Sequence, residues 1–176
     1  ELTDSFDKEF IDFRFAEHGG GSECLGGEVL EDLMASGKLL RENIVVVSKV
    51  GYLQGQNYEL SHERKKEGRP FPELVEYGEA LEHCIHPEVL KDQLNRSLER
   101  LKLKTIDFYL LHNPEYYLEW AQKNGHAQEA ARTEYYRRIR KAFEYLESEP
   151  RLIFKSEFPD LIGAISNHLE DEDGVA

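Results

Sequence analysis

The sequence lacks any long hydrophobic run. None of its apolar stretches approaches the roughly 20 residues that a helix needs to span a bilayer. The first ten residues, ELTDSFDKEF, have neither the basic region nor the apolar region of a signal peptide. These absences argue against a membrane protein and against a secreted one, and we expect the chain to be cytoplasmic.

Positive charge is scarce as well. The chain carries 22 lysine and arginine residues against 35 acidic ones, which gives a formal net charge of −13 at pH 7. Such a surface repels the phosphate backbone of DNA and RNA instead of attracting it. The composition therefore argues against nucleic acid as a partner, and it suits an ordinary globular protein of 176 residues.

Cysteine is rare, and its two positions, Cys24 and Cys84, lie far apart in the sequence. Without a secretory signal we expect free structural thiols in a reducing compartment. Cys84 lies between His83 and His86, which places nitrogen and sulfur ligands close together. No second cluster completes a zinc site, so the pattern favours a plain loop before a helix, and we predict no metal.

Segments of strand character alternate with segments of helical character along the chain. Short runs rich in β-branched and aromatic residues predict strands at 9–13, 43–49, 105–112 and 160–167. Apolar residues at helical spacing predict helices at 22–40, 86–104 and 127–147. The second helix has the clearest signature, because Pro87 suits a first helical position and Leu90, Leu94, Leu98 and Leu101 share one face.

This alternation predicts an α/β fold with parallel strands, because each helix must return the chain to the same end of the sheet. The runs IVVV and FYLL are continuously apolar, as in strands covered on both faces. We predict a single domain over residues 1–176, either a doubly wound sheet or part of a (β/α) TIM-type barrel. Residues 53–87 are expected to form a long loop insertion, and residues 168–176 an acidic tail.

Polar side chains stand at the end of each predicted strand. They are Asp12, Lys49, His112 and the pair Ser166 and Asn167. Any one of them alone would be an ordinary cap or surface residue, but the chemistry of parallel α/β folds collects at the carboxyl ends of the strands. An ammonium at the end of VVVS also needs a carboxylate nearby, which Asp12 can supply. Together these residues predict a shared site.

Several stretches resemble the aldo-keto reductases. FID with GGGSECLGGEVL resembles the family's second strand and following helix, and ENIVVVSKVGY resembles its third strand with the active-site lysine. The most specific stretch, LNRSLERLKLKTIDFYLLHNPE, resembles the helix and fourth strand that deliver the active-site histidine. RKAFEYLE and IGAISN resemble the next helix and the fifth strand. The resemblance covers most of the chain and implies about half of an eight-stranded (β/α) barrel.

The resemblance implies an enzyme that transfers a hydride from NADPH or NADH to a small carbonyl substrate. It implies catalytic roles for Asp12, Lys49 and His112, and contacts of Ser166 and Asn167 with the nicotinamide carboxamide. In the family a tyrosine protonates the carbonyl oxygen, the lysine and aspartate lower its pKa, and the histidine orients the substrate.

The chain departs from the family pattern at two points. The position of the family tyrosine is held by Glu17, which leaves Glu17, His112 and Tyr52 as candidate proton donors. The first strand and the sixth to eighth strands have no counterpart in this sequence, so we expect either a longer protein or self-association that covers an open barrel. Both points keep open a second interpretation, an impaired relative that acts as a binding or scaffolding protein.

Overall fold

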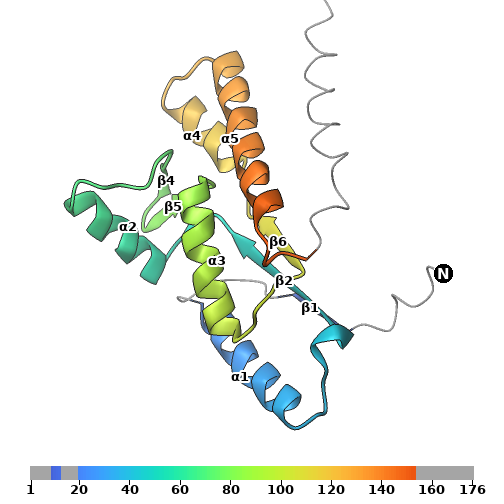
Figure 1. Ribbon diagram of the computed structural model, residues 1–176. Helices are drawn as coiled ribbons and strands as arrows, with labels where there is room; N and C mark the ends of the chain where they lie inside the picture. The colour runs from blue at the N-terminus through green and yellow to red at the C-terminus, as the bar shows by residue number, and fades with distance from the viewer. Residues whose placement is uncertain (1–8, 13–19, 154–176) are drawn as a thin grey trace, which may run out of the picture.

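The computed structural model describes residues 9–12 and 20–153 (Figure 1). Three parallel strands form its main sheet in the order β1-β2-β6. Their bounds are Glu9–Asp12 for β1, Ile44–Val50 for β2 and Phe108–Leu111 for β6. The three parallel strands thus lie in the sheet in the order in which they occur along the chain. The prediction of an α/β fold with parallel strands is confirmed for the described part of the chain, as a partial sheet.

Helices connect these strands, and those at 21–35, 87–101 and 128–148 lie where helices are expected, whereas the short helix at 116–123 is an addition. They are α1 (Gly21–Ala35), α3 (Pro87–Leu101), α4 (Tyr116–Lys123) and α5 (Gln128–Ser148), with a short 3-10 turn at Arg41–Asn43 before β2. Pro87 is the first residue of α3, as predicted, and the Nδ1 atom of His86 caps that helix by accepting a hydrogen bond from the backbone N–H of Glu88. Helices α1 and α3 pack against each other.

The chain returns to the main sheet after α5. The backbone N–H of Ile106 donates to the carbonyl oxygen of Arg151 at 3.0 Å, and the N–H of Ile153 donates to that of Ile106 at 3.1 Å. Ile106 and Leu152 form a parallel bridge through these bonds. A further parallel pairing therefore begins beside β6, in the order that a (β/α) barrel requires. The strand predicted at 160–167 lies outside the described residues.

The hydrophobic core lies between the sheet and the helices. Ile44, Val46 and Val50 of β2 are buried against the four leucines of α3 that share one face. On the opposite face of the sheet Lys49 is half-buried, and Leu110, its partner in the register, is 43% exposed. Within the described ranges one face of the sheet is covered, and the other is partly open.

The segment between β2 and α3 differs from the expectation of a long loop at 53–87. It contains the helix α2 (Gln56–Lys66) and an antiparallel sheet of order β3-β5-β4. The bounds are Tyr52–Leu53 for β3, Val75–Gly78 for β4 and Leu81–His83 for β5. We call residues 52–83 the inserted unit. The prediction was wrong because α2 is almost wholly polar and the strands are two to four residues long, so neither shows a clear hydrophobic period.

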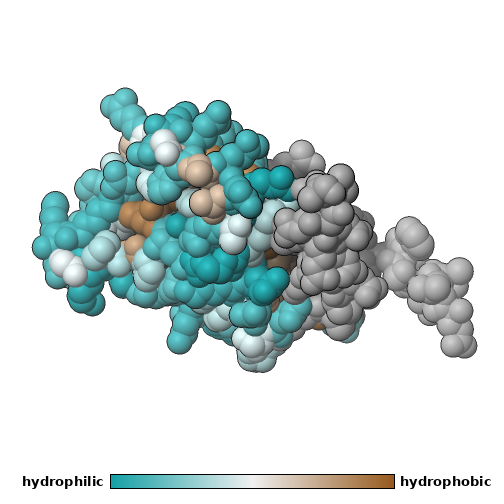
Figure 2. Space-filling view, turned by 90° about the horizontal axis from the view of Figure 1, so that it is seen from above, coloured by the Kyte–Doolittle hydropathy of each residue, from teal (hydrophilic) through white to brown (hydrophobic). Residues whose placement is uncertain are grey.

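Viewed from above, the described part of the molecule shows a largely hydrophilic surface with a small hydrophobic area (Figure 2). Among the described residues, no helix is long and apolar enough to cross a membrane. Self-association and the single-domain assignment stay predictions.

A close approach of α1 and α3 gives a first test. A Cβ atom on Gly27 would overlap the carbonyl oxygen of Arg100 and lie 2.9 Å from the Cα of Leu101, so Gly27→Ala must push the helices apart. We expect a loss of about 1–3 kcal/mol in the free energy of unfolding, measured by urea denaturation. Gly21→Ala is the control, since its Cβ meets nothing within 4 Å. Equal stability of the two variants would contradict this packing.

The buried His83 gives a second test. Burial lowers the pKa of His83 from the ordinary value of 6.5 to about 4. As the pH falls, His83 is therefore protonated near pH 6.5 in the unfolded chain but only near pH 4 in the folded protein. The free energy of unfolding falls as the pH drops through this window. Between pH 7 and pH 5 the native protein should lose about 2 kcal/mol more than His83→Gln, which has no titrating group there. Urea denaturation measures both proteins. An equal change in the free energy of unfolding of the native protein and of His83→Gln between pH 7 and pH 5 would refute the prediction.

Candidate active site

Three of the predicted site residues come together at the carboxyl ends of the parallel strands. Asp12 is the last residue of β1 and pairs with Val47, two residues before Lys49 on β2. His112 follows β6 directly, and its backbone N–H donates to the carbonyl oxygen of Val50 at 2.8 Å. The three positions therefore lie at one end of the sheet on successive strands. Glu17, Ser166 and Asn167 lie outside the described residues.

Lys49 and His112 are close enough to influence each other. Burial lowers the pKa of His112, and the positive charge of Lys49 lowers it further, while the negative charge of Glu115 opposes them. His112 is therefore neutral near pH 7, with one ring nitrogen that donates a hydrogen bond and one that accepts. The side chains at this end of the sheet offer a cation beside an uncharged hydrogen-bond donor.

Tyr52 lies over the ring of His112. The two ring centroids are 4.2 Å apart and the planes are tilted by 30°. The Tyr52 hydroxyl donates to the Oδ1 atom of Asn113 at 2.8 Å and lies 2.9 Å from the hydroxyl of Tyr116. Burial, together with the contact with Tyr116, raises the pKa of Tyr52, so its phenol stays protonated. The contact gives the imidazole a fixed neighbour on one face.

A row of aromatic rings extends from His112 into the inserted unit. Tyr52 stacks on Tyr116 with centroids 5.5 Å apart, and Tyr116 stacks on Tyr77 with centroids 3.7 Å apart. Tyr52 begins β3, Tyr77 lies on β4, and Tyr116 opens α4. We call Tyr77, Tyr116, Tyr52 and His112 the aromatic row. The inserted unit thus supplies one wall beside the strand ends.

His83, Cys84 and His86, which lie close together in the sequence, each have a partner within the protein. His83 is 2% exposed, and its Nε2 atom lies 2.7 Å from the carbonyl oxygen of His112. The thiol of Cys84 contacts the carbonyl oxygen of Pro72 at 3.2 Å, and His86 caps α3. Over residues 9–12 and 20–153 no three His, Cys, Asp or Glu side chains are grouped so that they could hold a metal ion.

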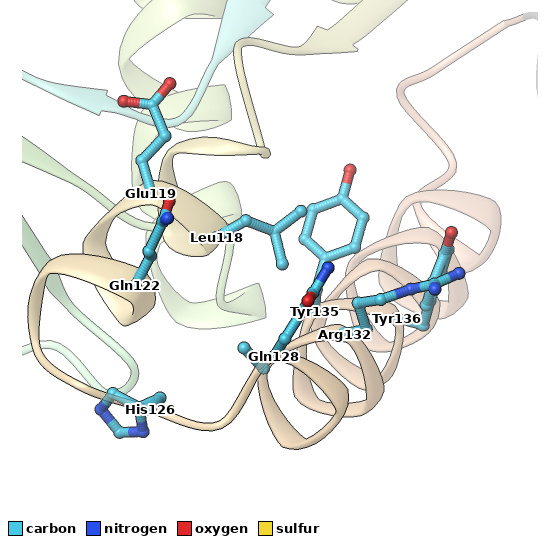
Figure 3. A pocket seen from close by; sticks show the side chains of 9 residues that line it. Leu118, Glu119, Gln122, His126, Gln128, Arg132, Tyr135 and Tyr136 are labelled. Atoms are coloured by element: carbon cyan, nitrogen blue, oxygen red, sulfur yellow. The ribbon is translucent and has the colours of Figure 1, made fainter.

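Two hollows of about 410 Å³ each lie along α5. The first separates α4 from α5, and Figure 3 shows Leu118 reaching toward the ring of Tyr135 inside it. The second is mainly apolar and is lined by Leu110, Leu111, Pro114, Tyr135, Tyr136, Ile139 and Phe143. Neither lining contains a predicted site residue, although the second hollow includes Leu111 and Pro114, which flank His112 and Asn113 in the sequence.

Sequence reasoning missed part of this arrangement. The sequence marks Tyr52 only as a candidate proton donor and His83 only as a nitrogen ligand near Cys84, yet both contact His112. Gln93 was not singled out, although its side-chain amide binds the backbone of Gly51 and Tyr52. A signal for it exists in the sequence, because a glutamine next to Leu94 on the apolar face of a helix needs polar partners.

One of the comparisons with known proteins found a match. The model of the aldo/keto reductase family matches residues 13–149, a range that includes Lys49 and His112. No curated protein and no solved structure matches the chain. The family match covers well over half of the sequence, and the chain therefore belongs to the aldo/keto reductase family.

Proposed function

We propose that the chain is an NAD(P)H-dependent oxidoreductase that reduces aldehydes or ketones to alcohols. Membership of the aldo/keto reductase family supports oxidoreductase chemistry. The observation that carries the proposal is the placement of Lys49 beside a neutral His112 at the ends of neighbouring strands. A cation beside an uncharged donor suits a carbonyl oxygen that gains negative charge during reaction.

Each residue has a distinct role in this proposal. Neutral His112 donates a hydrogen bond to the carbonyl oxygen and orients the substrate. Lys49 supplies a positive charge that favours the developing alkoxide, and Asp12 balances that charge. When bound, a reduced nicotinamide supplies the hydride for the carbonyl carbon. Ser166 and Asn167 are proposed to bind its carboxamide, on the strength of the sequence alone.

The source of the final proton is a choice between residues. Glu17 stands at the sequence position of the family tyrosine. Of the two other candidates, Tyr52 carries a phenolic proton, and neutral His112 would have to become an imidazolate to give one up. Among the described side chains Tyr52 is thus the better alternative to Glu17. Its raised pKa makes the Tyr52 phenol a weaker acid than an ordinary tyrosine.

A second function follows from Glu17. A carboxylate beside an ammonium is more firmly ionised and a poor proton donor, which favours an impaired relative that binds ligands or scaffolds other proteins. Cofactor binding without turnover would support this function over the first.

Cofactor binding and turnover can be measured directly on the purified chain. We expect quenching of protein fluorescence by NADPH or NADH, followed by loss of the reduced-nicotinamide absorbance when a panel of aldehydes and ketones is added. Heat-denatured protein is the control for non-enzymatic oxidation. The absence of both binding and oxidation would refute the reductase function for this chain.

Replacement of Lys49 tests the site itself. Lys49→Met keeps most of the length of the side chain but removes the charge, so kcat should fall by about a hundredfold or more because the alkoxide loses its cation. Lys66→Met is the matched control, since Lys66 is an exposed residue at the end of α2. Full activity of Lys49→Met, or an equal loss in both variants, would remove the assigned role.

A further inference from the structure

We propose that His83 of the inserted unit is a positioning residue, which holds the backbone of His112 and thereby fixes the imidazole of His112 in the candidate site. The inference rests on the proposed function in one respect, namely that His112 acts on the substrate. It assigns to the inserted unit a task that neither the family match nor the strand-end pattern contains.

The contact itself is short and buried. The Nε2 atom of His83 lies 2.7 Å from the carbonyl oxygen of His112. A carbonyl oxygen can only accept, so Nε2 must carry the hydrogen in the neutral ring. His83 is 2% exposed, and water therefore competes little for this donor. A donor that is buried and properly paired contributes direction as well as stability.

Gly51 brings the two histidines together. A Cβ atom at this position would lie 2.8 Å from the Nε2 atom of His83 and 3.2 Å from the carbonyl oxygen of His112. The backbone of Gly51 also has a φ of 131°, which side chains rarely tolerate. Only glycine leaves room for the hydrogen bond between His83 and His112 at the end of β2.

Two further residues, Gln93 and Cys84, form hydrogen bonds with the backbone at Gly51 and Tyr52. The N–H of Gly51 donates to the Oε1 atom of Gln93 at 3.0 Å, and the Nε2 atom of Gln93 donates to the carbonyl oxygen of Tyr52 at 2.8 Å. The carbonyl oxygen of Gly51 accepts from the N–H of Cys84 at 2.9 Å. Gln93 of α3 and Cys84, which follows β5, thus hold the backbone of Gly51 and Tyr52 in one arrangement.

His112 is consequently held at three points. Its backbone N–H is bound to Val50, its carbonyl oxygen to His83, and its ring is covered by Tyr52. With N–H and carbonyl both fixed, the Cα–Cβ bond of His112 has a set direction. A catalytic donor works best when supporting residues hold it within a fraction of an ångström of its place. Removal of the His83 donor should loosen this support and leave the fold intact.

The first experiment uses the native protein. Nitrogen-15 NMR of histidine rings distinguishes the two neutral tautomers. At pH 7 we expect His83 to be neutral with its hydrogen on Nε2. A His83 ring with its hydrogen on Nδ1 would overturn the proposal, because such a ring cannot donate to the carbonyl oxygen of His112.

The second experiment compares two variants of similar polarity. In His83→Gln the amide nitrogen reaches the place of Nε2, and in His83→Asn it falls short by about one bond length. The readout is the pKa of His112 by NMR, which reflects Lys49, Glu115 and the cover of Tyr52 around it. We expect His83→Gln to keep the native value and His83→Asn to move toward the ordinary value, with kcat lower by about tenfold. Identical titration of His112 in both variants would overturn the proposal.

The two proposals fail in different ways. A native protein that neither binds NADPH nor oxidises it refutes the reductase function, whereas the tautomer of His83 and the titration of His112 still decide the positioning role. Conversely, an active enzyme in which His83→Asn has a native His112 titration and native kcat keeps the function and removes the positioning role.

Discussion

Space for a single hydrogen atom at Gly51 is the constraint on which the rest of the candidate site depends. The end of β2, the carbonyl oxygen of His112 and the ring of His83 meet there at distances that exclude a side chain. Because these three groups are packed together at Gly51, the inserted unit joins the parallel sheet at a fixed place. The orientation of Tyr52 over His112 follows from that junction, since Tyr52 is the next residue in the chain.

The two faces of strand β2 have different tasks, because one binds the helices and the other presents Lys49. Ser48 donates to the buried carboxylate of Glu23 at 2.6 Å, and Arg100 binds the other oxygen of that carboxylate at 2.8 Å. This network ties α1, β2 and α3 together on the helix side. The next residue, Lys49, belongs to the opposite face and to the candidate site. A buried carboxylate with both oxygens paired stabilises the strand that presents the lysine, although an unpaired one would be costly.

The sequence alone predicts those parts of the fold in which one property repeats at short range. Leucines at helical spacing predict α3, continuous β-branched residues predict β2, and polar groups at the ends of such strands predict where Lys49 and His112 meet. The inserted unit has no such repeat, because α2 is polar and its strands are very short. The contact of His83 with His112 joins residues far apart in sequence, and no local pattern encodes it. Glu17, Ser166 and Asn167 lie outside the described residues, so their predicted roles rest on the family resemblance.

The inserted unit has two ends that differ in how well they tolerate changes of sequence. Tyr52 pairs with His83 at one of them. The end nearest the parallel sheet is fixed by the meeting of Gly51, His83 and His112. The opposite end turns between β4 and β5 at Glu79 and Ala80, which are exposed. Insertions at that turn lengthen the hairpin away from the sheet and leave the pairing register of β5 unchanged. Evolution or protein engineering can therefore add a new recognition segment there while the strand-end chemistry is preserved.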